Sequence, residues 1–431
     1  MPLGGLGRPG VAQLSPLAEA TDLEVQVKEP LLSKNLFGIL SAYTLFAFSY
    51  SLFLIIPIFY TAVLHTPATS LGQIKAVNGL AAAVMIPVVG RGIDKWGRLN
   101  TFRAGIVLLI AVGLGYLRVD RAGALPMLLS GLTGAAFVLT FNAGVTLAAD
   151  AAPAGRLTEV LGVVGAVVTT MNAGGAVTAE ALSSLYGWHA VFWLSVCASV
   201  LAGIASFFAS APSSTKSPAL QRSEANADPR LSLAGVYCGI ALAGIGFAAI
   251  FIFHQAYAVS LGLHSVRTFF IGFTLTAVLA RVLLSKFIDR WGRVRVAFWA
   301  CWGYALTAAL LSSGELRPLS LFGALFGVAH GALYPALNAL VVEAVPASRR
   351  GRAIALYNGV FNAGVSIGAL AWGLLADRAG YQVVFLSASG CSVLGAIAVS
   401  RTRQLERTLK ARAEQHGASV SFAPSEEPVA L

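Results

Sequence analysis

Gly90-Arg-Gly-Ile-Asp-Lys-Trp-Gly-Arg98 is a short polar stretch that returns, nearly unchanged, as Ser285-Lys-Phe-Ile-Asp-Arg-Trp-Gly-Arg293. Its two aspartates, Asp94 and Asp289, are 195 positions apart. Two further landmarks recur in the same order at an offset of 193 positions: Pro153 to Arg156 with Pro346 to Arg349, and Gly187 to Phe192 with Gly380 to Phe385. Three landmarks at nearly one offset indicate that the chain contains a duplicated unit.

The residues around this stretch are strongly apolar. Of 431 residues, 57% are hydrophobic and only 11% are charged, against roughly 25% charged residues in a soluble domain. Four long stretches contain no Asp, Glu, Lys or Arg: 35 to 74, 188 to 215, 231 to 266 and 318 to 342. About 20 apolar residues cross a bilayer as a helix, and the period-2 alternation of barrel strands is missing. The sequence therefore predicts membrane-spanning helices.

Together, the apolar segments and the repeat predict twelve transmembrane helices in two six-helix parallel repeats, an all-α membrane protein. The first six spans are expected at 35–60, 72–91, 101–117, 123–148, 158–182 and 188–210. The other six are expected at 232–258, 267–287, 296–313, 318–342, 352–376 and 380–400. This divides the chain into a tail (1–34), a first half (35–210), a Ser- and Pro-containing linker (211–230), a second half (231–400) and a second tail (401–431).

The net charge of +11 follows this predicted topology. Basic residues gather between spans 2 and 3, between spans 8 and 9, before span 11 and in the C-terminal tail. The opposite side keeps Lys75, Arg118, Arg121, Arg267, Arg317 and Arg378. Such a bias predicts a multi-pass protein of the inner membrane with both termini in the cytoplasm, and nucleic acid is not expected as a partner.

The cysteines and the N-terminal segment give no sign of other chemistry. Cys197, Cys238, Cys301 and Cys391 lie far apart in apolar runs, without the paired spacing of a zinc site. Residues 1–34 lack an apolar stretch behind a basic start, so we interpret them as a cytosolic tail and not as a signal peptide. No carboxylate pair, nucleophile elbow or phosphate loop stands out, so neither an enzyme nor a bound metal or cofactor is predicted.

The repeated stretch resembles the signature G-x-L-A-D-R-x-G-R of major facilitator superfamily transporters, and the second copy has Ser in place of the first Gly. The resemblance covers nearly the whole chain. It implies a secondary transporter that works by alternating access around a site near the bilayer midplane. A monomer whose partners are a small-molecule substrate and the lipid bilayer is expected.

In that family the loop Asp faces the start of a helix from the other half, where unpaired N–H groups carry partial positive charge. By resemblance Asp94 would meet the eleventh span near Gly351, and Asp289 the fifth near Thr158. Close backbone approach would then explain the glycines of the loop. The predicted latch comprises Gly90, Asp94, Gly97, Arg98, Asp150, Asp289, Gly292, Arg293 and Glu343. The alternative is that these charges only orient the loops.

Polar residues inside the predicted spans are candidates for contact with a substrate, since they are costly there. His330, Tyr334 and Asn338 are four residues apart and share one helix face. The other candidates are Tyr50, Asn142, His254, Gln255, Arg281, Tyr357, Asn358 and Asn362. For each single residue, a structural hydrogen bond between helices is the simpler interpretation.

Glu180 is the only carboxylate that we place within a span away from the cytoplasmic edge, near the outer end of span 5. It is therefore a candidate for coupling transport to protons, although it could equally lie in the headgroup region. The Gly-rich signature that exporters carry in this span is only partly met, because Gly175 stands where Pro would be.

The function predicted from the sequence is therefore secondary active transport of a small organic solute, with export favoured over import. The interior charges lean basic through Arg281, which favours a neutral or anionic solute. Two alternatives stay open: an uptake permease for a sugar or an organic anion, and a receptor or scaffold of the same fold that transports nothing.

Overall fold

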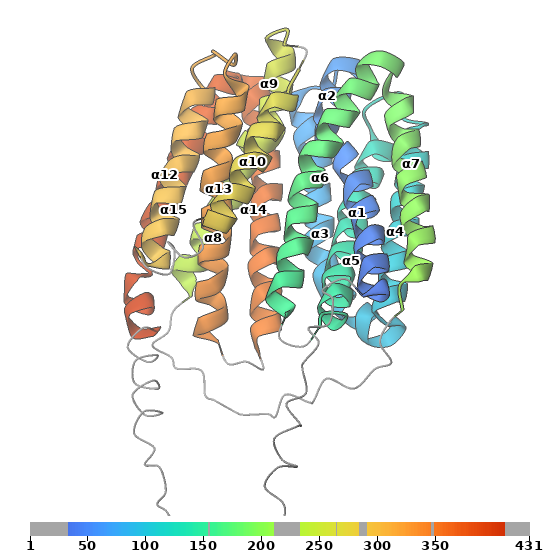
Figure 1. Ribbon diagram of the computed structural model, residues 1–431. Helices are drawn as coiled ribbons and strands as arrows, with labels where there is room; N and C mark the ends of the chain where they lie inside the picture. Colours follow the sequence, from blue (N-terminus) through green and yellow to red (C-terminus); the bar gives the residue numbers. More distant parts are fainter. Residues whose placement is uncertain are drawn as a thin grey trace, which may run out of the picture.

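The computed structural model describes residues 33–153, 156–210, 233–263, 265–283, 291–345 and 349–409. These residues are almost all helical, and none of them belongs to a β-strand. Figure 1 shows the helices standing roughly parallel, as two neighbouring bundles.

The first bundle begins with α1 (Lys34–Ser51), which continues through η1 (Leu52–Ile55), α2 (Ile56–Ile58) and η2 (Phe59–Val63) as one broken span. The spans that follow are α3 (Ala68–Trp96), α4 (Arg98–Tyr116), α5 (Ala124–Asp150), α6 (Leu157–Tyr186) and α7 (Trp188–Ala205), the last extended by η3 (Ser206–Phe208).

The second bundle likewise begins with a broken span, made of α8 (Ala234–Phe247), η4 (Ala248–Phe253) and α9 (His254–Ser260). It continues with α10 (Arg267–Leu283), α12 (Arg293–Leu311), α13 (Leu319–Ala344), α14 (Arg350–Ala379) and α15 (Tyr381–Ser400). Each half therefore starts with an interrupted helix and adds five regular ones.

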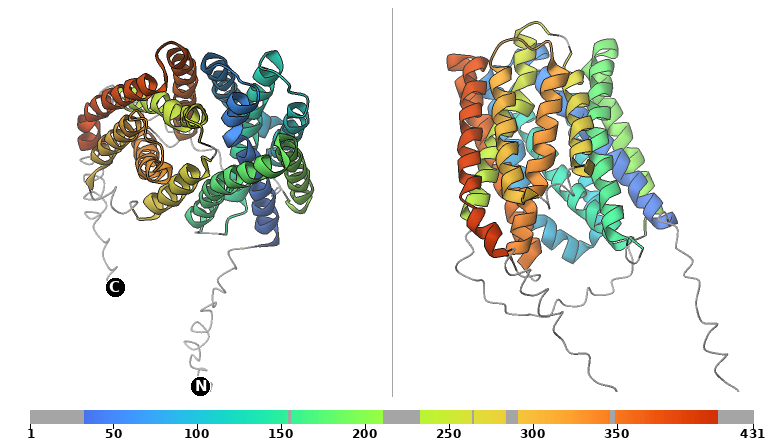
Figure 2. Two further views of the ribbon diagram at one scale, coloured as in Figure 1. Left: turned by 90° about the horizontal axis from the view of Figure 1, so that it is seen from above. Right: turned by 60° about the vertical axis from the view of Figure 1, so that its left-hand side comes forward.

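Eleven helices of the described chain are long and apolar enough to cross a membrane. The remaining helix, α10, has 17 residues and ends where the described residues stop. All twelve predicted spans therefore coincide with a helix, and the predicted all-α membrane fold is confirmed. Seen along the helix axes, the two halves lie side by side (Figure 2).

The molecule has two faces, defined by the helices that begin at each. The lower face is the end at which α1, α4, α6, α8, α12 and α14 begin, and the upper face is the end at which α3, α5, α7, α10, α13 and α15 begin. The described ends of the chain, at α1 and after α15, both lie at the lower face (Figure 1).

Single glycines join consecutive helices at equivalent places in the two halves. Gly97 links α3 to α4 with φ +81°, and Gly292 precedes α12 with φ +93°. Gly187 and Gly380, which link α6 to α7 and α14 to α15, have φ +80° and +84°. Side chains disfavour positive φ, so this turn calls for glycine. Each half thus contains two such glycine turns, at positions that correspond in the repeat.

Candidate substrate cavity and its two ends

A cavity of about 270 Å³ lies between the two halves. Both bundles contribute to its wall, which is lined from the first half by α1 to α6 and from the second by α8, η4, α9, α10, α13 and α14. That volume lies just below the roughly 300–1,000 Å³ of pockets for drug-sized molecules, so it suits a small solute.

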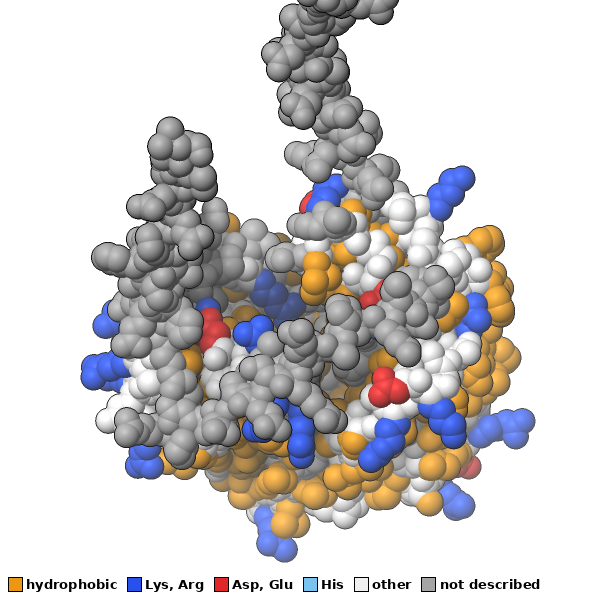
Figure 3. Space-filling model, turned by 90° about the horizontal axis from the view of Figure 1, so that it is seen from below, with side chains coloured by type: hydrophobic (Ala, Val, Ile, Leu, Met, Phe, Trp, Pro, Cys, Tyr) orange, Lys and Arg blue, Asp and Glu red, His pale blue; other side chains and the backbone are white. Residues whose placement is uncertain are grey.

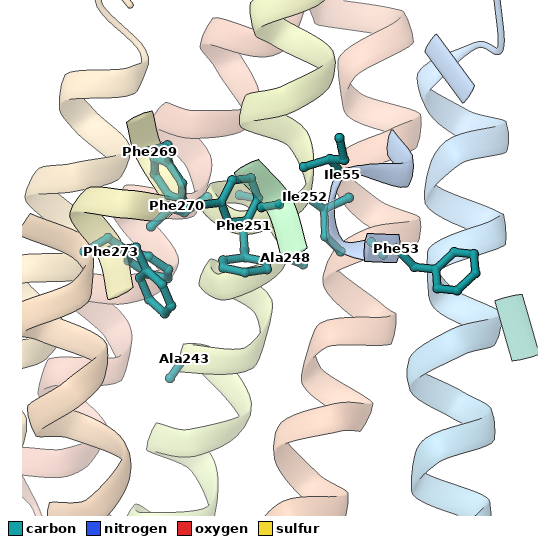
Figure 4. Close-up of a cluster of buried hydrophobic side chains, with 14 of the residues drawn as sticks. Phe53, Ile55, Ala243, Ala248, Phe251, Ile252, Phe269, Phe270 and Phe273 are labelled. Carbon is teal, nitrogen blue, oxygen red and sulfur yellow. The ribbon is translucent and has the colours of Figure 1, made fainter. Parts of the chain in front are cut away.

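The interrupted first helix of each half shapes part of this wall. Pro57 follows the 3₁₀ turn η1, and η4 is a π-helical segment. Such segments break the regular backbone ladder and often occur at functional sites. They bring Phe53, Leu54, Phe251 and Ile252 to the cavity. In Figure 4 the side chains of η4 and α10 form one aromatic cluster, with Phe251 and Phe270 in edge contact at 5.4 Å between ring centroids.

Among the described residues, two basic side chains line the cavity, one from each half. Lys75 lies on α3 and forms no hydrogen bond or ion pair with any residue that the structure describes. Arg281 lies on α10, has exposed surface, and donates a hydrogen bond of 2.7 Å from Nη1 to Thr169 Oγ1 on α6. That bond joins the two halves at the cavity wall.

Five of the residues that the sequence suggested for substrate contact line this cavity: Tyr50, Gln255, Arg281, His330 and Asn362. Tyr50 stacks on Phe137 at 4.5 Å between centroids. Gln255 Nε2 donates a hydrogen bond of 3.0 Å to the backbone carbonyl of Leu54, which is a further bond between the halves. The Tyr304 hydroxyl and His330 Nδ1 are 2.6 Å apart, so this His has a hydrogen-bonding partner within its own half.

The other six candidates lie outside the cavity lining. Tyr334 hydrogen-bonds Asn358, and the Tyr357 hydroxyl donates to the Tyr334 carbonyl at 2.8 Å. His254 is fully buried, with its ring stacked on Phe269 at 3.9 Å between centroids. Asn142 Nδ2 donates a hydrogen bond of 2.8 Å to the backbone carbonyl of Val138, one turn earlier in the same helix. Asn338 Oδ1 is buried without a described hydrogen-bond partner.

Several polar residues of the lining do not stand out in the sequence. The expected topology puts Lys75 on the outer side, and the structure corrects this: α3 begins at Ala68, four residues before the predicted start, so Lys75 lies two turns inside the helix. Lys75 already fell within the predicted span 72–91, and this could have identified it as a residue inside the membrane. The uncharged polar residues missed are Asn78, Tyr116, Ser130, Thr133, Thr169 and Asn172, which resemble ordinary helix polar residues in sequence.

At the upper face, Glu180 of α6 binds the start of α10 in the other half. Its Oε2 accepts hydrogen bonds from the backbone N–H groups of Val266 at 2.7 Å and Arg267 at 2.8 Å. Its Oε1 accepts one from the Ser265 hydroxyl at 2.6 Å. Glu180 is 8% exposed and does not line the cavity. An anion at a helix N-terminus satisfies unpaired donors and opposes the helix dipole.

Asp377 does the same at the second upper contact between the halves. Its two carboxylate oxygens accept hydrogen bonds from the backbone N–H groups of Ala68 at 2.9 Å and Thr69 at 2.7 Å, where α3 begins. Asp377 belongs to the last turn of α14. The upper face thus carries two equivalent contacts, in each of which a carboxylate at the end of one helix caps the start of a helix in the other half.

Backbone contact between α3 and α14 closes the same end. A Cβ atom added to Gly72 would lie 2.3 Å from the Ala369 carbonyl oxygen, and one added to Gly373 would lie 2.5 Å from that of Ala68. Glycine lets helices in a membrane approach closely. Lower down, a Cβ on Gly359 would be 3.6 Å from Ile86. The two helices therefore diverge toward the lower face.

At the lower end of the cavity, the spacing around helix glycines indicates an opening. A Cβ added to Gly90 on α3, or to Gly162 or Gly165 on α6, would meet no atom of the described residues within 4 Å. Figure 3 shows the lower face with a recess and basic side chains around it. As far as the described residues go, the cavity is thus closed above and open below.

The described residues of the predicted latch lie at this open lower face. Arg98 forms an ion pair with Asp150, and Arg293 forms one with Glu343, each pair within one half. The side chain of Asp94 is exposed and has no ion-pair partner among described residues. Asp289 lies outside the described residues. The expected close approach at Gly90 and Gly97 is absent in this conformation, and positive φ accounts for Gly97 instead.

Comparison with known proteins agrees with this architecture. The sequence profile of the Major Facilitator Superfamily matches residues 36–271 and 236–427. The chain belongs to this superfamily. Membership confirms the resemblance drawn from the repeated loop, and with it the assignment to a family of transporters.

The relatives and structural neighbours are named as transporters. The uncharacterized MFS-type transporter YhhS of Salmonella typhimurium is 26% identical over 355 residues, which cover 78% of this chain and 83% of that protein. An uncharacterized MFS-type transporter of Pseudomonas aeruginosa is 33% identical over 172 residues, 39% of this chain and 42% of the relative.

Two solved structures share the fold. A mutant form of the nucleoside transporter NupG superposes with a TM-score of 0.71 at 16% identity, over 86% of this chain and all of that one. The human organic anion transporter MFSD10 superposes with a TM-score of 0.61 at 13% identity, over 85% of this chain and 99% of that one. At these identities the likeness is one of fold.

Proposed function

We propose that this protein is a secondary active transporter that moves a small organic solute across the inner membrane by alternating access, with export favoured over import. The observation that carries the proposal is the cavity between the halves, which is closed above by contacts between the halves and open below. The lower face is then the cytoplasmic one, as the basic residues there suggest.

Alternating access requires that the upper contacts break while the lower ends of the same helix pairs come together. Those pairs are α3 with α14 and α6 with α10, because they carry the Asp377 and Glu180 contacts. The solute would enter from the cytoplasm in the state seen here and leave when the upper face opens. Export is proposed on the family resemblance, and a proton is the candidate coupling ion.

Counterflow in vesicles tests the proposal. The purified protein is reconstituted and loaded in turn with a panel of neutral, anionic and cationic organic solutes, and entry of the labelled solute is followed. We expect at least one solute to accumulate transiently in protein-containing vesicles and not in empty ones. No counterflow across the whole panel would favour the receptor or scaffold alternative.

The lower latch gives a further prediction. We expect Asp94→Asn and Asp289→Asn to slow transport several-fold, because each removes a charge that would face a helix start only when the lower face closes. Such contacts contribute roughly 0.3–2 kcal/mol. For Asp94→Asn the lower-open state should be unaffected, since Asp94 has no described ion-pair partner in it. Initial counterflow rates measure the effect, and rates equal to those of the unaltered protein would show that these charges only orient the loops.

A further inference from the structure

We propose that the cavity binds a small organic anion with two acidic groups and an apolar body, held between Lys75 of the first half and Arg281 of the second. The binding chemistry follows from the cavity alone. That the anion is then carried across the membrane rests on the proposed function.

The first observation is the charge of the lining. Lys75 and Arg281 face the cavity, and no Asp or Glu is among the lining residues that the structure describes. The described carboxylates lie instead in loops or toward helix ends: Asp94, Asp120, Asp150, Glu159, Glu180, Glu315, Glu343, Asp377 and Glu406. Two of these carboxylates, Glu180 and Asp377, lie at the interface between the halves. Both accept hydrogen bonds from backbone N–H groups there.

A cation within the membrane region is costly unless an anion accompanies it, because it loses the stabilisation that water provides. Arg281 has one neutral partner, the Thr169 hydroxyl, and Lys75 has none among the described residues. When the cavity closes around its contents, these two charges need counterions. A bound dianion supplies both.

The second observation is the placement of the two cations. The α3 and α10 helices both begin at the upper face, with Lys75 seven residues along α3 and Arg281 fourteen residues along α10. At 1.5 Å per residue, the two backbone positions differ in depth by roughly 10 Å. The two cations are therefore carried at different depths of the backbone, which suits acidic groups at two ends of a molecule better than a single compact anion.

The third observation is the wall around the cations, which is mostly aromatic and aliphatic. Tyr50 and Phe137 stack at 4.5 Å between centroids, and Phe247 and Phe251 at 4.6 Å. Both pairs line the cavity, one in each half. Flat aromatic faces favour an apolar or aromatic body between the acidic groups.

Because each half supplies one cation, a dianion would bind both halves at once. Contacts of this kind draw two rigid bodies together, so the ligand would favour the closed cavity over the open one. Either cation alone would hold the anion without joining the halves. Both charges should therefore be needed for tight binding.

Thermal unfolding of the purified full-length protein in detergent tests the inference. The probes are terephthalate with two carboxylates, benzoate with one, and benzamide with none. We expect terephthalate to raise the Tm most, benzoate to raise it less and benzamide to leave it unchanged. Lys75→Gln and Arg281→Gln should each weaken the apparent affinity for terephthalate about tenfold or more, and Lys75→Arg should restore most of it.

The control is Arg118→Gln, which removes an exposed positive charge after α4 at the upper face, outside the lining. It should bind terephthalate like the unaltered protein. Stabilisation by benzamide equal to that by terephthalate, unchanged affinity in both Gln variants, or no stabilisation by either acid would each overturn the inference. Counterflow of a neutral or cationic solute would support transport and contradict the anion site. Binding of terephthalate without flux of any solute would support the anion site and contradict transport.

Discussion

The double variant Glu180→Gln with Asp377→Asn is expected to open the upper face. Both substitutions keep the size of the side chain but place an amide where a carboxylate accepted backbone N–H groups, from Val266 and Arg267 in one case and from Ala68 and Thr69 in the other. Hydrogen bonds to a charged group contribute roughly 1.5–3 kcal/mol. Losing about 2 kcal/mol at each contact changes the ratio of upper-closed to upper-open molecules about 30-fold per site.

The reporter for this shift is a single cysteine at Val365, which lines the cavity, in a background without Cys197, Cys238, Cys301 and Cys391. A membrane-impermeant maleimide applied at the upper face should label it slowly in the parent and much faster in the double variant. Each single variant should have an intermediate rate, because the two contacts involve different helices and should add.

Glu315→Gln provides the matched control. It removes an exposed upper carboxylate whose described ion pair, to Arg317, stays within one half. Its labelling rate should equal that of the parent. If the double variant also labelled like the parent, Glu180 and Asp377 would be structural caps without a part in the closure of the upper face.

Gly72→Val is expected to disfavour the lower-open conformation. The nearest atoms to a new Cβ at this position all belong to the other half: the Ala369 carbonyl oxygen at 2.3 Å, the Gly373 Cα at 3.1 Å and the Ala369 carbonyl carbon at 3.2 Å. Inserting methyl groups into a tight contact costs roughly 1–3 kcal/mol, which corresponds to about a 5- to 150-fold change in an equilibrium.

Counterflow should therefore fall by about tenfold or more, with the Val365 cysteine labelled from the upper face. Stability should change less, because the packing within each half is untouched, and thermal unfolding measures this. Gly390→Val is the control: a Cβ on this exposed glycine of α15 meets no described atom within 4 Å, so transport should persist. Full transport activity in Gly72→Val would mean that α3 and α14 do not need their close contact.

The spans were predictable because hydrocarbon imposes length and polarity on every helix, and the repeat then divided them between two halves. Errors of a few residues in the predicted ends of the spans led to functional candidates being missed. The second span was predicted to begin four residues after its actual start, so Lys75 was assigned to the outer edge of the membrane. In the structure Lys75 lies in the cavity wall. Asp377 escaped notice for the same reason, since α14 runs three residues beyond its predicted end.

The cavity was predicted only in part because its lining depends on packing between halves that are far apart in sequence. Helical spacing correctly grouped His330, Tyr334 and Asn338 on one helix, but His330 alone lines the cavity, while Tyr334 hydrogen-bonds Asn358 on α14. A period of four residues identifies a face of a helix without telling which neighbour covers it. Likewise, no local pattern distinguishes Thr169, the partner of Arg281, from other threonines in a span.

Labelling of the Val365 cysteine in the otherwise unaltered protein, from each side of the membrane in turn and without added solute, tests the central claim most directly. The proposed carrier rests with its cavity open to the cytoplasm and closed above. The reagent should therefore react rapidly in inside-out vesicles and slowly in right-side-out vesicles. Equal rates from both sides, or faster reaction from the outer side, would contradict a carrier that rests open at its lower face.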